Sequence, residues 1–392
     1  MKTLVIANKS PFPVIDGGCF AMNVFLKNLQ AISEIEQIDY FMLSTHKHPF
    51  SKDAIPTDLT IKTKFHSLEI DTKLYAKSAL RHLIQGKSYN LSRFYDSAVA
   101  QKLETLIHEN QYDCVIFESL FPLVYIDVIR NVSKAKCILR AHNIEFEIWD
   151  DLQLNEGNPL KKWYLNQLVK ALKKEEIAYY KQLDLILSLS IDDIGKIEKI
   201  CSTPTRFIPV SIENTVCKTD YSSNSLCFIG SYNWEPNIEA INWFLSDLNP
   251  LIQQSIPVQV EIAGKDGATV FKDNSSASVE FKGFVESPSA FLKANGIFIA
   301  PMKSGSGVKI KVLEAMSNGL PCVLTPKAAE GLDLPTNYPI CKTDQEFINL
   351  CIDLALNLEK REQLGKLGFE YIQANFGFES VVGKLKTSLI GN

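Results

Sequence analysis

Residues 300–321 read APMKSGSGVKIKVLEAMSNGLP, and this stretch decides how the chain folds. Apolar side chains at positions 308, 312, 313 and 316 have the spacing of one helix face. We therefore expect a helix that begins near Val308 and ends at Asn318 and Gly319, where a left-handed residue and a following proline stop it. The four residues before Lys303 are largely apolar and should close a buried strand.

The turn between this strand and this helix contains Gly305, Ser306 and Gly307. A helix N-terminus presents unpaired backbone N–H groups, and glycines let the backbone close on an anion without a Cβ in the way. The spacing matches neither the mononucleotide P-loop nor the dinucleotide fingerprint. The turn is thus typical of a phosphate-binding loop of another kind, and the alternative is a tight strand-to-helix turn with solvated side chains.

Three charged residues follow the turn on the expected helix. Lys309 and Lys311 should add mobile positive charge beside an anion. Glu314 falls on the second turn, where a carboxylate can accept hydrogen bonds from vicinal hydroxyls, as an acidic residue does for ribose in other nucleotide folds. The pattern predicts a site for a phosphorylated sugar or nucleotide.

The composition describes a globular chain of 392 residues with 46% hydrophobic residues, long enough for two domains. A net charge of -4 and the lack of a basic and aromatic pattern argue against a nucleic-acid partner. Nine cysteines stand singly, several in apolar runs, as expected of reduced core thiols in a cytoplasmic protein. The first apolar run breaks at Lys9, and no run approaches about 18 residues, so we expect no signal peptide and no membrane span.

Short apolar runs alternate with helical patterns, which is typical of parallel strands buried on both faces. The runs lie at residues 4–6, 114–117, 137–139 and 185–187, and again at 226–229, 258–262, 297–299 and 322–324. Helices are expected at 238–245, 289–293 and 369–389, among others. The chain should therefore be an α/β protein with two doubly wound parallel sheets.

Residues 209–224 are polar and aperiodic, which indicates a linker. We expect a Rossmann-like N-terminal domain over residues 1–210, a linker over 211–224, a C-terminal domain over 225–372, and a last helix over 373–392 that packs back on the first domain. The two sheets should face a central cleft, because ligands of open parallel sheets bind outside the carboxyl ends of the strands.

Residues 73–87 form a basic amphipathic stretch without an acidic residue. It carries Lys73, Lys77, Arg81 and Lys87 beside Leu74, Leu80, Leu83 and Ile84. Such a helix could rest on an anionic membrane surface, or it could be an ordinary solvated face. The remaining histidines (His46, His48, His66, His82 and His108) have no metal-ligand spacing, and no metal site is expected.

Four blocks occur in a fixed order along the chain. Gly17 and Gly18 precede an amphipathic helix, and residues 140–145 read RAHNIE. Residues 228–240 open the second set of strands, and residues 304–332 contain the glycine-rich turn. In this order the blocks resemble the retaining GT-B glycosyltransferases of family four, which use nucleotide-diphosphate sugars.

The resemblance implies two Rossmann-like domains and transfer of a hexosyl group from a UDP- or GDP-type sugar to a hydroxyl of a glycan or lipid-linked acceptor. It implies no cofactor and no metal, and the sequence has no D-x-D pair of the kind that carries the ion in the metal-dependent fold. It also suggests polysaccharide assembly in the cytoplasm, at the inner face of the membrane.

The resemblance assigns residue roles as well. The diphosphate and sugar of the donor would contact Gly17, Gly18, Gly305, Ser306, Gly307 and Lys311; the ribose Glu314; and the nucleobase Gly283, Phe284 and Val285. His142 would orient the sugar, Glu145 would steer the acceptor hydroxyl, and Lys309 would stabilise the leaving diphosphate. A front-side attack needs no protein nucleophile.

Two positions depart from the family pattern. Ser306 stands where the family commonly has a donor-contacting glutamate, and residues 231–235 lack the usual arginine and lysine. Lys309 is the obvious replacement for that charge. The alternatives are a sugar-nucleotide epimerase of the same fold, a nicotinamide-dependent enzyme, and an inactive partner protein that binds a nucleotide sugar.

Overall fold

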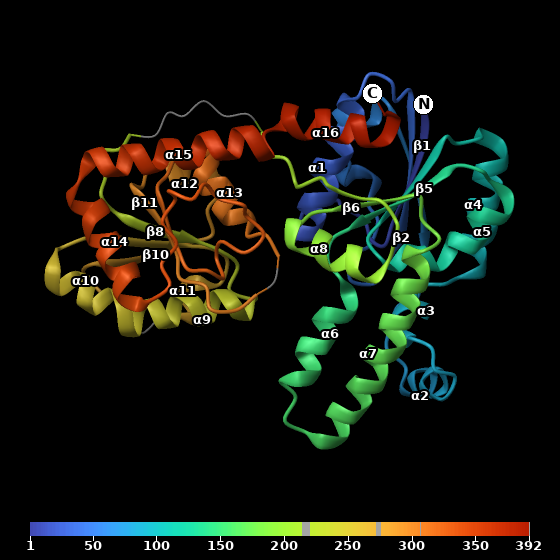
Figure 1. Cartoon of the computed structure of the whole chain (residues 1–392), viewed down its shortest axis with the longest axis horizontal. Helices are drawn as coiled ribbons and strands as arrows, with labels where there is room; N and C mark the ends of the chain where they lie inside the picture. The colour runs from blue at the N-terminus through green and yellow to red at the C-terminus, as the bar shows by residue number, and fades with distance from the viewer. Residues whose placement is uncertain (214–219, 272–275, 306, 392) are drawn as a thin grey trace. The chain divides into compact units, whose positions relative to one another are not determined.

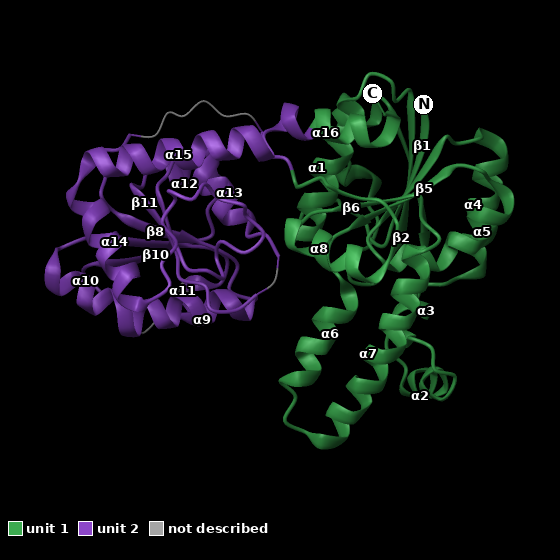
Figure 2. Ribbon diagram, in the orientation of Figure 1, with its two compact units in different colours: residues 1–210, 382–392 green, residues 211–381 purple. Residues whose placement is uncertain are grey.

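The computed structural model describes residues 1–213, 220–271, 276–305 and 307–391. The chain divides into two compact units, Met1–Val210 with Val382–Asn392, and Ser211–Val381 (Figure 2). The expected linker is not a separate element, since its described residues 211–213 and 220–224 fall in the second unit and residues 214–219 lie outside the described part. Among the described residues, no helix combines the length and the apolar character needed to cross a bilayer.

The first unit is built on a seven-stranded sheet in the order β3-β2-β1-β4-β5-β6-β7, with every pair parallel. The order reverses between β1 and β4, which is the switch point of a doubly wound sheet. The strands are β1 (Lys2–Ala7), β2 (Gln37–Ser44), β3 (Thr63–Glu69), β4 (Cys114–Glu118), β5 (Lys136–Ala141), β6 (Leu185–Ser188) and β7 (Thr205–Phe207).

The four strands expected from apolar runs are confirmed, and their side chains form the core of the unit. Leu4, Val115 and Leu139 are fully buried, as a strand covered on both faces requires. The helices are α1 (Gly17–Ala31), α2 (Ala76–Ile84), α3 (Tyr89–Ser92), α4 (Ser97–Asn110), α5 (Ile126–Val132), α6 (Glu145–Leu154), α7 (Pro159–Tyr180), α8 (Ile191–Ile200) and α16 (Phe378–Ile390) (Figure 1).

The amphipathic stretch at 73–87 is shorter than expected, because Tyr75 has extended backbone angles and Gly86 has a left-handed one. α16 closes the first unit from the far end of the chain. Leu385 and Leu389 are buried, and Lys136 Nζ donates to the carbonyl of Leu389 at 3.4 Å. The expected tail helix at 369–389 is in fact two helices, because α15 ends at Phe376 and α16 begins at Phe378, with Gly377 between them.

The second unit has a five-stranded parallel sheet in the order β10-β9-β8-β11-β12, which again reverses beside its first strand. The prediction of two doubly wound parallel sheets is confirmed. The strands are β8 (Leu226–Ile229), β9 (Val260–Ala263), β10 (Val279–Gly283), β11 (Ile297–Ala300) and β12 (Cys322–Leu324).

The helices of the second unit begin where prolines and caps favour them. Pro236 and Pro288 occupy first-turn positions of α9 and α12, which starts these helices earlier than the apolar spacing predicts. The helices are α9 (Glu235–Trp243), α10 (Asn249–Ser255), α11 (Gly267–Val270), α12 (Pro288–Lys293), α13 (Ile310–Ser317), α14 (Asp344–Leu356) and α15 (Leu358–Phe376). A π-helical turn joins α9 to α10.

Candidate functional site

The glycine-rich turn follows β11, as expected, but the helix after it begins at Ile310 rather than near Val308. Gly305 and Gly307 have φ of +94° and +71°, which only glycine adopts without strain. Lys309 is still extended and is the N-cap, with its carbonyl accepting from the N–H groups of Val312 and Leu313. The left-handed turns therefore delay the helix by two residues; Ser306 lies outside the described residues.

Lys309 is anchored within the loop and is not the mobile charge that the sequence suggested. Its side chain is buried, and Nζ donates to the carbonyl of Gly307 and, at 3.3 Å, to Glu330 Oε2. Lys327 reaches the same carboxylate at 3.0 Å. Burial lowers the pKa of Lys309, against the charge of Glu330. The cation is thus held at the start of α13, next to the glycine turn.

Lys311 points into the second unit, which the sequence did not predict. Its Nζ donates to Asn237 Oδ1 of α9 and lies 4.4 Å from the centre of the Phe228 ring on β8. Burial, with Lys309 nearby, lowers the pKa of Lys311 to about 7. This side chain links α13 to β8 and α9. Lys311 would therefore act on a bound anion through the electrostatic field of its ammonium group and not through a direct hydrogen bond.

Glu314 occupies the second turn of α13, as expected. Burial raises the pKa of its carboxyl group. No described residue donates a hydrogen bond to the carboxylate or forms an ion pair with it. The carboxylate is only partly buried and is not among the fully buried unpaired groups, so its oxygens are open to the hydroxyl groups of a ligand in place of water.

The candidate base-binding residues follow β10, at the same edge of the sheet as the glycine turn. Gly283 is left-handed, and its carbonyl accepts from the N–H of Gly264 at 2.7 Å. Phe284 is 74% exposed, so it is not a core side chain, and Val285 is half-buried. The exposed Phe284 ring is therefore available to stack against the nucleobase of a bound ligand.

Gly17 and Gly18 are the first residues of α1 and do not merely precede it. Asp16 is the N-cap and accepts from the N–H of Cys19 at 2.7 Å. Lys9 Nζ donates to both oxygens of Asp16, at 2.8 and 2.7 Å. The turn after β1 therefore brings a lysine to the N-terminus of a helix, a feature that the glycine pair alone did not reveal.

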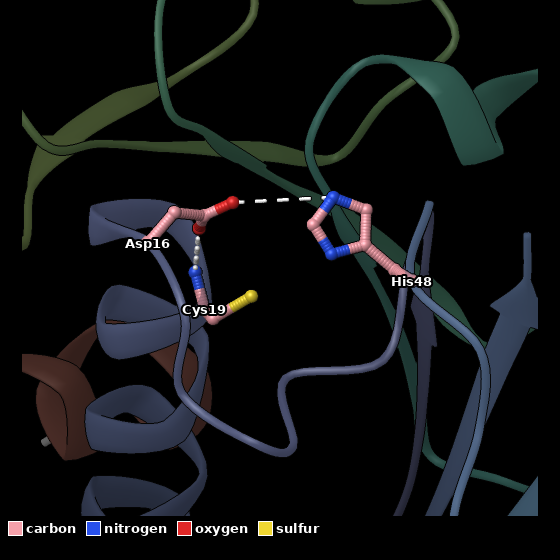
Figure 3. Close-up of side chains that lie close together, drawn as sticks. All are labelled: Asp16, Cys19 and His48. Carbon is pink, nitrogen blue, oxygen red and sulfur yellow. Dashed lines mark hydrogen bonds and ion pairs between the residues drawn. The ribbon is translucent and has the colours of Figure 1, made fainter. Parts of the chain in front are cut away.

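No sequence pattern predicts His48 at this position, but its Nε2 lies 3.9 Å from Asp16 Oδ2 (Figure 3). Asp16, Cys19 and His48 present ligand atoms within 4.8 Å of one another, and these residue types can bind zinc. Lys9 and the Cys19 N–H already use both Asp16 oxygens. An ion would have to displace Lys9, so we assign no metal to this cluster.

His142 follows β5 directly, where a buried charge cluster holds its ring. Its Nε2 lies 2.5 Å from Glu118 Oε1 at the end of β4, and Arg140 donates to the same oxygen. Arg140 Nη1 also lies 3.2 Å from Nε2, but the carboxylate is closer and can only accept, which assigns the proton to Nε2 and leaves Nδ1 with a lone pair. The imidazole is thus oriented by a carboxylate, as in many catalytic histidines.

Both charged members of this cluster are fully buried. Burial alone would raise the pKa of Glu118, but the Arg140 guanidinium and His142 outweigh it and hold that pKa below its ordinary value. Burial lowers the pKa of His142 in spite of the carboxylate. The Arg140 guanidinium also lies 4.4 Å from the centre of the Phe25 ring. His142 is therefore neutral, and it lies beside the buried ion pair of Glu118 and Arg140.

Glu145 is the first residue of α6, three positions after His142. Its Oε1 accepts from Trp149 Nε1 at 3.2 Å, and burial raises the pKa of its carboxyl group. Glu176 of α7 caps this helix by accepting from the N–H groups of Glu145 and Phe146, each at 2.9 Å. Sequence reasoning missed Glu176, because its partners lie about thirty residues away.

Glu176 should make stability depend on pH. Burial raises its pKa to about 7 although three donors, including Tyr180 Oη, face it. The folded state therefore binds this proton more tightly than the unfolded state, and stability falls as pH rises from about 4.5 to 7. We expect the wild type to lose about 3 kcal/mol more than Glu176→Gln over this interval. Urea unfolding at several pH values measures the difference.

The matched control is Glu198→Gln, which removes an exposed carboxylate from α8. Its pH profile should follow that of the wild type. Parallel profiles for Glu176→Gln and the wild type would show that the capping carboxylate keeps an ordinary pKa.

Within each unit, the candidate residues lie on the side of the sheet where the strands end. In the first unit, Gly17 and Gly18 follow β1, and His142 and Glu145 follow β5, on either side of β4. In the second unit, the glycine turn and Lys309 follow β11 and lead into α13, which carries Glu314. The segment 283–285 stands at the end of β10, which β9 and β8 separate from β11 in the same sheet.

Residues 223–355 match the family model described as "Glycosyl transferases group 1". Among curated proteins, the chain is 24% identical over 399 residues to an uncharacterized 44.6 kDa protein in the cps region of Klebsiella pneumoniae, with 98% of each chain covered.

Solved structures share the fold across the whole chain. An Anabaena protein, HepE, in complex with UDP and glucose is 12% identical, with a TM-score of 0.65 and 99% of each chain covered. A mutant of S. aureus TarM in complex with fondaparinux, alpha-GlcNAc-glycerol and UDP is 13% identical, with a TM-score of 0.70 and 100% of each chain covered. At these identities the likeness establishes the two-domain architecture.

Proposed function

Residues 223–355 are a glycosyltransferase group 1 domain within a chain of the GT-B fold, and from this premise we propose that the protein is a retaining, metal-independent hexosyltransferase. Its donor would be a nucleotide-diphosphate sugar of the UDP or GDP type, and its acceptor a hydroxyl of a glycan or lipid-linked molecule. UDP in the HepE and TarM structures supports a UDP-type donor. The cps region that encodes the Klebsiella relative supports a glycan product.

The observation that carries the proposal is the unpartnered carboxylate of Glu314 beneath the glycine turn. The left-handed Gly305 and Gly307 leave backbone N–H groups for an anion, and Lys309 fixes a positive charge beside them. Glu314, one turn further along α13, lacks a described partner and can accept from two ribose hydroxyls. An anion site and a carboxylate for hydroxyl groups on the same helix suit a nucleoside diphosphate better than a lone phosphate.

The chemistry requires stabilisation of the charge that grows on the departing diphosphate. Lys309 and the N–H groups of the turn, both in the second unit, would supply it. The neutral His142 would orient the sugar through Nδ1, and Glu145, whose raised pKa favours proton sharing, would steer the acceptor hydroxyl. The leaving phosphate would accept the acceptor's proton.

We further propose that the protein works in the cytoplasm. The eight described cysteines are all buried free thiols, which suits a reducing compartment.

Calorimetry with UDP, GDP, ADP and NAD, each with and without magnesium, tests the proposal. We expect one nucleoside diphosphate to bind equally well under both conditions, and the matching nucleotide sugar to be slowly hydrolysed. Binding of NAD alone would contradict the proposal, and binding without any turnover, in the presence of acceptors, would favour an inactive partner protein.

Replacing Glu314 with alanine should weaken binding of that nucleotide about 10- to 100-fold, because two hydrogen bonds to a charged group are lost. Calorimetric Kd values measure the change. Glu370→Ala, which removes an exposed carboxylate from α15, is the matched control and should bind like the wild type. Unchanged affinity in Glu314→Ala would contradict the ribose contact.

A further inference from the structure

The first unit exposes large apolar side chains on two neighbouring elements. The first element is α2 with the residues just before it, and the second is the tip of the α6–α7 hairpin, residues 152–163. Figure 1 shows this hairpin extending beyond the sheet of its unit with α2 beside it. The exposed side chains are Leu74, Leu80 and Ile84 around α2, and Leu152, Leu154, Leu160 and Trp163 at the tip.

One face of α2 combines apolar and basic groups. Lys77 and Arg81 are one turn apart, as are Leu80 and Ile84, and at about 100° per residue the four side chains cover an arc of about 100°. All four are exposed, Ile84 to 79%. This face therefore presents a narrow apolar stripe with a row of cations along it.

The opposite face of α2 is the one that packs within the unit. His82 and Leu83 are half-buried, and the His82 ring lies 5.2 Å from that of Tyr89, between centroids. α2 also contacts α7. Internal packing thus fixes the orientation of α2 without using its basic and apolar face.

The hairpin tip is apolar at its outermost positions. Leu160 is 81% exposed and Trp163 58%. The charges between them are engaged locally, since Lys161 pairs with Glu156 and Lys162 Nζ donates to the carbonyl of Leu154 at 3.1 Å. With Asp150 and Asp151 on α6, the tip itself is not basic, so it offers apolar area and an indole while α2 offers the positive charge.

The charges of α2 and the apolar side chains of the hairpin tip together indicate what binds to this surface. A protein interface of this size usually mixes both signs of charge, whereas residues 73–87 contain four cations and no acid. Tryptophan and leucine beside lysine and arginine suit the boundary between acyl chains and anionic headgroups. We propose that α2 and the hairpin tip together form a docking surface for an anionic lipid bilayer.

The surface lies outside the candidate donor and acceptor residues, so the proposal does not rest on the proposed activity. The full chain should co-sediment with vesicles of phosphatidylcholine containing phosphatidylglycerol at least about 10-fold more strongly than with phosphatidylcholine alone. The preference should shrink as salt is raised from about 0.05 to 0.5 M. Equal binding to both vesicles, or none, would overturn the proposal.

Two paired substitutions separate the contributions. Lys77→Glu with Arg81→Glu should reduce binding to anionic vesicles at least about 10-fold by reversing two charges. Leu160→Glu with Trp163→Glu should also reduce it, and the loss should persist at high salt. Each variant is first checked for wild-type thermal unfolding, since all four side chains are exposed.

The controls place similar changes at exposed positions away from this surface. Lys102→Glu with Lys134→Glu reverses two charges elsewhere on the first unit, and Leu356→Glu alters an exposed leucine of the second. They should bind vesicles like the wild type. If the controls lose as much vesicle binding as the test variants, the effect comes from net charge and the proposed surface is wrong. If the chain binds a membrane protein but no lipid vesicles, the surface is a site for a protein partner and the lipid proposal is wrong. Nucleotide affinity should be unchanged throughout.

Discussion

Replacing Lys309 with alanine is expected to lower turnover of the matching nucleotide sugar about 10- to 1000-fold, because the leaving diphosphate loses a fixed positive charge. The side chain is buried at the N-cap of α13, so the cation needs no reorganisation when the bond breaks. Affinity for the nucleotide should change less than kcat, as expected for a group that acts mainly in the transition state. Steady-state kinetics together with calorimetry measure both.

Lys327→Ala is the matched control for this prediction. Lys327 pairs with the same Glu330 carboxylate but is partly exposed and does not touch the glycine turn. The Lys327→Ala variant should retain most of the wild-type activity. Lys309→Arg keeps the positive charge and should be more active than Lys309→Ala. Wild-type turnover in Lys309→Ala, with unchanged thermal unfolding, would remove this lysine from the chemistry.

Glu118→Gln is expected to lower the free energy of unfolding of the first unit by about 3–5 kcal/mol. The substitution leaves the Arg140 guanidinium buried without its carboxylate, and it frees the His142 ring. Chemical denaturation followed by circular dichroism and tryptophan fluorescence measures the loss. Activity should also fall, since His142 no longer has a fixed tautomer.

The double variant Glu118→Gln with Arg140→Met tests the cause. Removing both charges should restore most of the stability but not the activity, since a buried pair contributes little net stability compared with apolar replacements. Glu36→Gln, which removes an exposed carboxylate paired with the N-terminus at 3.3 Å, should change stability by less than about 0.5 kcal/mol. A double variant no more stable than Glu118→Gln would show that packing, not charge, causes the loss.

The strands that the sequence predicts are those whose apolar runs are buried on both faces, such as β1 and β11. β2 escapes this reasoning because Asp39 interrupts it; the carboxylate is buried but accepts from His66 at 2.6 Å. β3 is half-exposed along its length, and β7 has three residues. β3 and β7 are edge strands, and the buried carboxylate of β2 is paired with a residue of β3. Both properties depend on the neighbouring strand, so a short stretch of sequence does not reveal them.

The candidate site also contains residues that a local pattern predicts and residues that only the fold brings together. His142 and Lys309 could be proposed from their local blocks, but Glu118 becomes a neighbour of His142 only through the register that pairs it with Arg140 across β4 and β5. A glutamate closing the apolar run at 114–117 was the signal available. The inward course of Lys311 depends on Asn237 and on the delayed start of α13, neither of which can be read from the glycine spacing.

The return of the chain to its first unit at Val382 has a consequence for synthesis. Translation delivers residues 1–210 early, yet the buried Leu385 and Leu389 of α16 are made only after the whole second unit. A nascent chain still short of residue 382 therefore has a complete seven-stranded sheet with an uncovered apolar strip where α16 will lie. The second unit can therefore complete its fold before the first unit, although the first unit is synthesised earlier.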